Sequence, residues 1–172
     1  MIPKRVSHEY SLKMPLEIER KFLVTHTHWR SEALGLYCCQ GYLSQRSDIT
    51  VRVRTLGEKA FLTIKKRQEP TQRISRLEFE YEIPFHEAQE LQKLCKIPLI
   101  EKTRYRLHYG GKMWDIDQFH GRNEGLLMAE VELNDPKEAI ELPSWVGEEV
   151  SDDSRYYNSN LALHPFEEWK GS

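Results

Sequence analysis

Charged side chains alternate with apolar ones along most of this chain, and the charges of one parity are sorted by sign. Acid-x-acid pairs occur at Glu17/Glu19, Glu78/Glu80, Asp115/Asp117 and Glu130/Glu132, and basic rows occur at Arg52/Arg54 and Lys102/Arg104/Arg106. Carboxylate pairs are hard oxygen ligands suited to Mg²⁺ or Mn²⁺, whereas arginine and lysine rows bind phosphate oxygens. Acidic rows that face basic rows would therefore suit a polyphosphate substrate bridged by a divalent metal ion.

The same alternation has a second interpretation. Alternating charge is the ordinary outer face of an antiparallel sheet. A solvated face, however, has no reason to sort its charges, because like charges on neighbouring positions are mildly destabilising. It would also use lysine as readily as arginine, whereas the basic rows here are mostly arginine. Spacing alone leaves both interpretations open.

The elements that must position these side chains are mostly strands. Period-two alternation predicts strands over 16–24, 36–45, 49–55, 60–68, 74–83, 100–109, 112–119 and 126–133. Turn residues separate them, and Tyr109-Gly-Gly-Lys112 is typical of a two-residue hairpin. One amphipathic helix is predicted over 85–96 and a shorter one between Thr25 or Thr27 and Gly35. The predicted fold class is α+β, mainly β, either as an open sheet with one wet face or as a closed barrel.

Composition narrows the class of protein. The 172 residues predict one domain, and 25 basic against 27 acidic residues give a net charge of −2. The absence of a basic excess argues against a general nucleic-acid binder. No apolar run approaches the length that spans a bilayer, and the N-terminus lacks the apolar core of a signal peptide. These two absences predict a protein that contacts no membrane. Three cysteines without a C-x-x-C pair predict reduced thiols in a cytoplasmic protein.

Seven motifs in order resemble one known family. Glu17-Ile-Glu-Arg-Lys21 is similar to the Glu-x-Glu-x-Lys signature of the CYTH domain, the triphosphate tunnel metalloenzymes. The similarity continues through Arg52-Val-Arg54, Thr63-Ile-Lys65, Arg76-Leu-Glu-Phe-Glu80, Glu101-Lys-Thr-Arg104, Trp114-Asp-Ile-Asp117 and Ala129-Glu-Val-Glu132. It ends at the tail Val150-Ser-Asp-Asp-Ser-Arg-Tyr-Tyr-Asn158. The resemblance implies a closed eight-stranded antiparallel barrel, a tunnel with a few flanking helices, over residues 14–172. Residues 1–13 match no motif and are expected to be a disordered extension.

The resemblance also implies a role for each charged row. The metal ligands would be Glu17, Glu19, Glu130 and Glu132, holding Mg²⁺ or Mn²⁺. The phosphate clamp would comprise Lys21, Arg52, Arg54, Lys65, Lys102 and Arg104, with Arg76 and the tail residue Arg155. Catalytic roles would fall to Lys102 and to three acids placed where a second metal ion or the attacking water is positioned, namely Glu78, Glu80 and Asp117.

The resemblance to the short bacterial type implies metal-dependent hydrolysis of inorganic tripolyphosphate to pyrophosphate and phosphate. Alternatives that stay open are a class IV-type adenylate cyclase, a nucleoside or thiamine triphosphatase, and a non-catalytic polyphosphate-binding protein. The expected partner is a small-molecule triphosphate, without nucleic acid, and the expected assembly is a monomer or homodimer.

Overall fold

The structure, a computed structural model, describes residues 16–46, 48–67 and 75–171. Its strands are β1 Leu16–Val24, β2 Gly35–Gln45, β3 Ile49–Leu56, β4 Lys59–Arg67, β5 Ser75–Glu82, β6 Ile100–Tyr109, β7 Lys112–Phe119, β8 Leu127–Glu132 and β9 Val146–Glu149. Its helices are α1 Phe85–Lys93 and α2 Asn158–Leu163. Single 3₁₀ turns occur at His28–Glu32, Gly121–Asn123, Ser154–Tyr156 and Phe166–Glu168.

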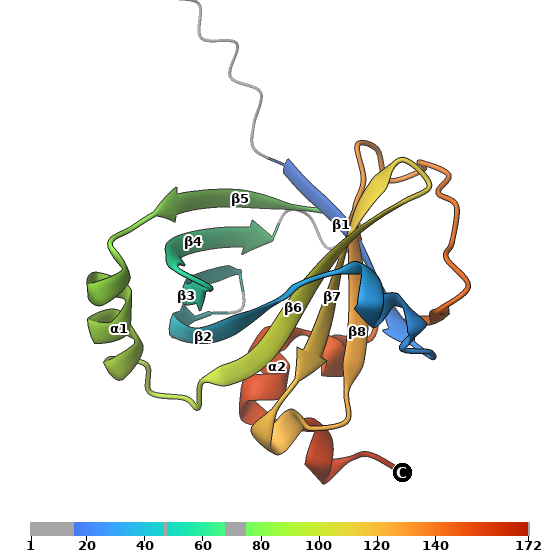
Figure 1. Cartoon of the computed structure of the whole chain (residues 1–172). Coiled ribbons are helices and arrows are strands. Elements are labelled where there is room, and N and C mark those ends of the chain that lie inside the picture. Colours follow the sequence, from blue (N-terminus) through green and yellow to red (C-terminus); the bar gives the residue numbers. More distant parts are fainter. Residues whose placement is uncertain (1–15, 47, 68–74, 172) are drawn as a thin grey trace, which may run out of the picture.

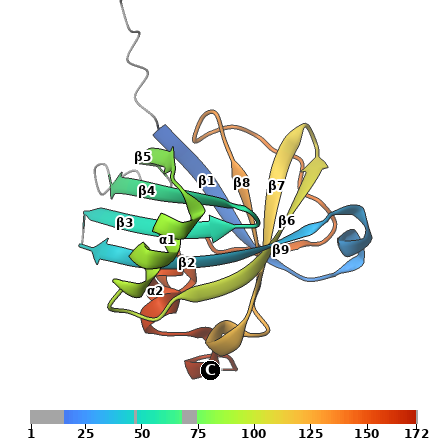
Figure 2. The ribbon, with the colours of Figure 1, turned by 60° about the vertical axis from the view of Figure 1, so that its left-hand side comes forward.

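The strands pair antiparallel into a closed ring (Figures 1 and 2). The order is β5-β4-β3-β2-β6-β7-β8-β1-β9, and β1 also pairs with β5, so that eight strands complete the circuit. Among the described residues, β1 and β5 close the ring at a seam of three register pairs, from Leu16↔Leu77 to Ile18↔Ser75. Beyond the seam, the last part of β1 pairs with β9 instead. The ring is thus continuous through all eight strands.

Strand register places the charged rows on the inner side of this ring. Residues directly opposite each other in antiparallel strands point to the same face. The pairs Lys65↔Glu78, Arg104↔Asp117 and Lys21↔Glu130 therefore bring opposite charges together along the interior. The alternation in the sequence is thus the alternation between the interior and the exterior of the ring.

Apolar side chains of the other parity pack outside the ring. Helix α1 lies across the outer face of β2, β3 and β4 (Figure 2), where Val53, Ala60 and Ala88 are buried. On the opposite wall, Phe22 and Trp114 pack beneath Trp29 and Trp145. These two clusters supply apolar burial on the outer faces of the strands, so the fold does not need an apolar core inside the ring.

One end of the interior is apolar. Ile100, Phe119 and Met128 share the parity of the charged rows but are buried against the C-terminal segment, whose Tyr156 and Leu161 complete the cluster. Helix α2 (red in Figure 1) lies at this end of the ring. The cluster therefore closes the ring interior at this end.

Most predicted elements are confirmed, and three differ. The eight strands are present within about two residues of the predicted bounds, and the Tyr109–Lys112 hairpin turns through two glycines with φ of 56° and 72°. Helix α1 ends at Lys93 rather than at residue 96, and the segment after Thr27 is a 3₁₀ turn without a side-chain cap. Strand β9 is not predicted from the sequence.

The expectation for residues 1–13 lies outside the described residues. All three cysteines are free. In the described part of the chain, no helix combines the length and apolarity needed to cross a membrane.

Candidate functional site

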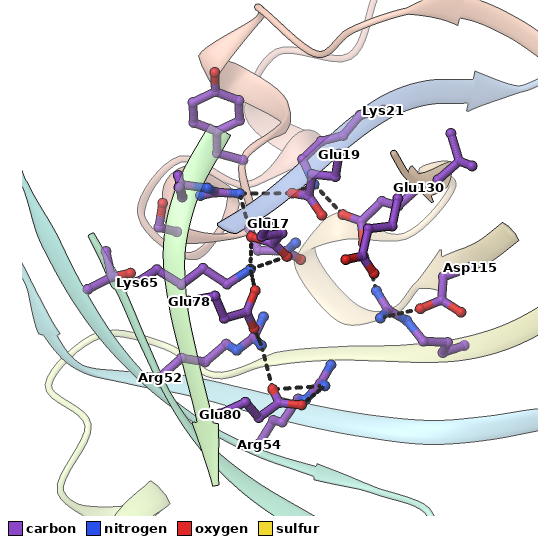
Figure 3. Close-up of a pocket in the computed structure, with 18 of the residues that line it drawn as sticks. Glu17, Glu19, Lys21, Arg52, Arg54, Lys65, Glu78, Glu80, Asp115 and Glu130 are labelled. Carbon is purple, nitrogen blue, oxygen red and sulfur yellow. Dashed lines mark hydrogen bonds and ion pairs between the residues drawn. The ribbon is translucent and has the colours of Figure 1, made fainter. Parts of the chain in front are cut away.

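The ring encloses a cavity of about 650 Å³ whose wall is almost evenly divided between the two signs of charge. Seven described basic residues line it: Lys21, Arg52, Arg54, Lys65, Arg76, Arg104 and Arg106. Seven described acidic residues line it: Glu17, Glu19, Glu78, Glu80, Asp115, Glu130 and Glu132. Figure 3 shows the labelled members of both sets converging from several strands. The interior is therefore close to neutral, although it is densely charged.

The first half of the wall is a chain of ion pairs across β1, β4 and β5. Lys65 Nζ lies 2.7 Å from a Glu17 oxygen and 3.0 Å from a Glu78 oxygen (Figure 3). Arg76 donates to Glu19 at 2.8 Å. Glu17 and Glu19 of β1 thus already have cation partners, which come from β4 and β5.

The second half continues the chain across β1, β8, β6 and β7. Lys21 Nζ pairs with both Glu19, at 2.7 Å, and Glu130. Arg104 donates to Glu130 and to Asp115, each at 2.9 Å. Lys21 and Arg104 therefore each bridge two carboxylates, so that the ion pairs form a continuous network along this half of the wall.

Arg52 and Arg54 complete the wall on β3. Both guanidinium groups bond to Glu80, at 3.3 Å and 3.0 Å, and Thr63 donates its hydroxyl to the same carboxylate at 2.8 Å. The Nε atoms of the two arginines are buried and have no hydrogen-bond partner within the described residues. These two arginines therefore keep donor capacity that the protein itself does not use.

Burial and neighbouring charges shift the pKa values of this network. Burial alone would raise the pKa of Glu130, but Lys21 and then Arg104 hold it well below its usual value. Burial would lower the pKa of Lys21, but Glu130 and Glu19 raise it. Burial and the adjacent Arg52 lower the pKa of Arg54. The paired groups are thus held in their charged forms around neutral pH.

Beneath the wall lies a buried pair of charges, Lys102 and Asp117, which is joined to Arg104 of the wall. Lys102 is 1% exposed, and its Nζ donates to Asp117 Oδ2 at 2.6 Å and to Asn158 Oδ1 at 3.2 Å. Asp117 also accepts two bonds from Arg104, at 2.7 and 2.6 Å. Burial lowers the pKa of Lys102, although Asp117 raises it. Lys102 and Asp117 do not line the cavity, and they act on it through Arg104 and Asn158, which do.

The cavity brings together most of the residues that the sequence singles out. All four predicted metal ligands and six of the eight predicted phosphate-binding residues line it, together with Glu78 and Glu80. Arg155 does not line it: its side chain is 59% exposed and pairs with Asp153 at 2.6 Å on the outside of the C-terminal segment.

Sequence reasoning left several lining residues out of the predicted site. Arg106 and Asp115 share the parity of the predicted rows, so the pattern could have included them. Tyr42, Tyr157, Asn158 and Ser159 also line the cavity but carry no charge, and the charge pattern has no means of finding them.

The donor set fits a divalent cation in its chemistry. Glu19 lies directly opposite Glu132, and Asp115 directly opposite Glu130, in the strand register. Like charges in directly opposed positions are destabilising, and a bound divalent cation would relieve that repulsion with oxygen ligands of the preferred kind. Within the described ranges, no three such side chains are arranged as a ready metal site. Binding would therefore require the carboxylates to exchange their lysine and arginine partners for the metal.

The ion-pair network predicts loss of stability in acid. Arg54 lowers the pKa of Glu80 against the effect of burial, and Arg104 does the same for Asp117. A carboxyl with a lowered folded-state pKa contributes stability above its unfolded-state pKa of about 4 and loses it as pH falls through the folded value. We expect the Tm of the ligand-free protein to be level from about pH 7 to pH 5 and to fall steeply below about pH 4.

The acid transition is measured by differential scanning fluorimetry across that range. In the Glu80→Gln variant one titrating carboxyl is missing, so Tm should start lower at pH 7 and fall less between pH 5 and pH 3. A wild-type Tm that rises on acidification would contradict the pairing.

Three comparisons place this chain among known proteins. The CYTH domain model matches residues 15–160. An inorganic triphosphatase of Acetivibrio thermocellus is 46% identical over 158 residues, covering 91% of this chain and 99% of that protein. An inorganic triphosphatase of Nitrosomonas europaea is 37% identical over 151 residues, covering 86% and 97%. The crystal structure of the inorganic triphosphatase NE1496 superposes with a TM-score of 0.61 at 36% identity, covering 86% and 94% of the two chains. The chain belongs to the CYTH domain family.

Proposed function

We propose that this protein hydrolyses inorganic tripolyphosphate to pyrophosphate and phosphate with the help of Mg²⁺ or Mn²⁺. The observation that carries the proposal is the cavity wall, where seven carboxylates and seven cations neutralise one another in a single enclosed space. Two relatives that match nearly their whole length bear the name inorganic triphosphatase, which supports the choice of substrate.

A triphosphate with its bound metal ion can replace both partners of the internal ion pairs, since the metal ion can pair with the carboxylates and the phosphates with the lysines and arginines. Each carboxylate that turns to a divalent cation releases the lysine or arginine with which it is now paired. The released cation is then available to the phosphate oxygens, which arginine binds through two parallel hydrogen bonds. Binding therefore exchanges one set of charge pairs for another and leaves few buried charges unpaired, which would otherwise be costly.

We assign the metal to the acids of β1 and β8, which are Glu17, Glu19, Glu130 and Glu132. Bound there, the cation would neutralise charge on the phosphate oxygens. We assign the phosphates to the cations of the wall: Lys21, Arg52, Arg54, Lys65, Arg76 and Arg104. The unused Nε donors of Arg52 and Arg54 support this assignment.

Glu78 and Glu80 lie on β5 and line the cavity, and we assign them to the positioning of the attacking water. Arg52 lies 3.8 Å from Glu78 and 3.3 Å from Glu80, so both carboxylates stay ionised and can accept a hydrogen bond from water. Attack in line with the leaving group then needs mainly orientation and charge neutralisation, as in phosphoryl transfer generally.

We further propose that the protein acts in the cytoplasm on a small-molecule triphosphate, as a monomer or homodimer, and binds neither nucleic acid nor membrane. The near-neutral net charge of −2 and the confinement of the basic rows to the interior support this proposal.

The decisive experiment measures phosphate release from tripolyphosphate with Mg²⁺, with Mn²⁺ and with EDTA. Parallel reactions contain ATP, thiamine triphosphate and a longer polyphosphate. Metal-dependent release that is fastest from tripolyphosphate supports the proposal. Faster turnover of an organic triphosphate, cyclic AMP as product, or binding without turnover would each replace it with the corresponding alternative.

Ligand binding should also stabilise the fold. We expect tripolyphosphate and Mg²⁺ together to raise Tm by several degrees, because ligand at 100 times its Kd adds about 2.7 kcal/mol to the folded state. Tripolyphosphate alone or Mg²⁺ alone should raise Tm less, since tripolyphosphate pairs only with the basic residues of the wall and Mg²⁺ only with the acidic ones. A Tm that does not move at millimolar tripolyphosphate and Mg²⁺ would contradict a triphosphate site in this cavity.

A further inference from the structure

The amide of Asn158 lies between the cavity and the buried charges beneath it. Asn158 is the first residue of α2 and lines the cavity together with its neighbours Tyr157 and Ser159. Its Oδ1 accepts a hydrogen bond from Lys102 Nζ at 3.2 Å. Lys102 itself does not line the cavity, so Asn158 is a direct link between the two.

The chemistry of Lys102 fixes which way this amide faces. A lysine ammonium can only donate hydrogen bonds, so the carbonyl oxygen of Asn158 must face Lys102. The Nδ2 group, which carries two N–H donors, therefore points away from the buried lysine. Within the described part of the chain, Nδ2 has no hydrogen-bond partner. Two N–H donors of a residue that lines the cavity are thus left unused by the described part of the chain.

The backbone at this position is held from several sides. Gln45 Nε2 donates to the Ser159 carbonyl at 3.1 Å, and Tyr157 Oη donates to the Ser151 carbonyl at 3.2 Å. Three residues further on, Leu161 is fully buried in the apolar cluster at the end of the ring. The amide is therefore oriented before a ligand arrives, and little ordering has to accompany its contact with one.

We propose that Asn158 binds the substrate directly: Nδ2 donates to a phosphate oxygen while Oδ1 holds Lys102. This inference rests on the proposed triphosphate substrate. The contact adds a neutral donor to a wall of charged ones, and it ties the C-terminal segment to substrate binding. It also connects the bound phosphate to Lys102 and, through Asp117, to Arg104, which is itself on the wall.

The Asn158→Asp variant tests the Nδ2 donor separately from the Oδ1 acceptor. Aspartate keeps an oxygen acceptor for Lys102 but replaces the donor with a negatively charged oxygen. We expect KM and the Kd for tripolyphosphate to rise at least 10-fold, with kcat changed less. Tm without ligand should be unchanged or higher, because Lys102 gains an anionic partner. The Asn158→Ala variant loses both contacts and should lower kcat as well as weaken binding.

The matched control is Asn160→Asp, which makes the same chemical change two residues along the same helix. Asn160 Nδ2 donates to the Ser154 carbonyl at 2.7 Å and does not line the cavity. Its variant should keep the wild-type KM. An equal rise in KM in both variants would mean that any negative charge on α2 weakens binding, and it would overturn the proposed contact.

The inference and the proposed function fail in different ways. Isothermal titration of tripolyphosphate measures binding whether or not turnover occurs. Wild-type protein that neither binds nor hydrolyses tripolyphosphate would refute the proposed function. Wild-type protein that does both, while Asn158→Asp binds with wild-type Kd and changes only kcat, would show that Asn158 acts through Lys102 alone and would overturn the inference.

Discussion

The Lys102→Met variant should hydrolyse tripolyphosphate at least ~100-fold more slowly than wild type at saturating substrate, the scale of losing one preorganised charge donor. Lys102 is almost fully buried and shares Asp117 with Arg104, whose guanidinium also pairs with Glu130. Without the Lys102 ammonium, Asp117 pairs with Arg104 alone, and Asn158 Oδ1 loses the hydrogen bond that it accepts from Lys102. We expect a smaller effect on KM, because the wall cations that clamp the phosphates remain.

Two variants control this prediction. Lys66→Met removes a lysine from an exposed position on β4 and should leave kcat unchanged. Arg52→Ala removes a clamp of the wall and should raise KM more than it lowers kcat, because such a clamp acts on ground and transition states alike. If Lys102→Met alters KM alone, Lys102 supports substrate binding only, through Arg104 and Asn158, and the chemical step depends on the metal and on Glu78 or Glu80.

The double variant Glu130→Gln with Glu132→Gln should abolish metal-supported hydrolysis. It removes two of the four proposed anionic ligands, and Glu130 is also the partner of Lys21 and Arg104. Breaking a buried ion pair from one side is costly, of the order of 3–5 kcal/mol, so Tm should fall as well. Activity is therefore to be measured well below the Tm of the variant, together with Mg²⁺ binding by calorimetry.

The control for this double variant is Glu87→Gln with Glu90→Gln on the exposed side of α1, which makes the same chemical change far from the cavity. It should keep wild-type turnover. Wild-type turnover and Mg²⁺ affinity in the Glu130/Glu132 double variant would remove β8 from the metal site.

The strands and the interior charges could be predicted because one physical pattern specifies both. A strand buried on one face shows alternation of polar and apolar residues, which predicts the strands of 16–24 and 112–119 and places Glu17 with Glu19, and Asp115 with Asp117, on one face of their strands. Only the family resemblance indicated that this face is the interior of a ring. The ring itself needed pairings between β1 and β8 that are distant in sequence. No local pattern encodes such pairings, and the family resemblance supplied them.

Other parts of the site left no local signal. Strand β9 is four residues long and forms because β1 extends beyond its seam with β5. Asn158 ends the tail motif, but its place at the cavity follows only from its contact with Lys102, since an uncharged amide at the start of a short helix resembles any surface residue. The burial of Lys102 beneath the wall, rather than on it, depends on the C-terminal segment packing against the end of the ring.

The position of β1 in the ring has a consequence for how the chain folds as it is synthesised. Hairpins β2–β3, β3–β4 and β6–β7 join neighbours in sequence and can form as they leave the ribosome. Strand β1 is synthesised first among the strands, yet its residue Glu19 can pair with Glu132 of β8 only after that residue has been synthesised. At 5–20 residues per second, that delay is roughly ten seconds. During this time β1, with its two acidic and two basic residues, has no β8 with which to pair, and the closed polar interior can form only after β8 has been made.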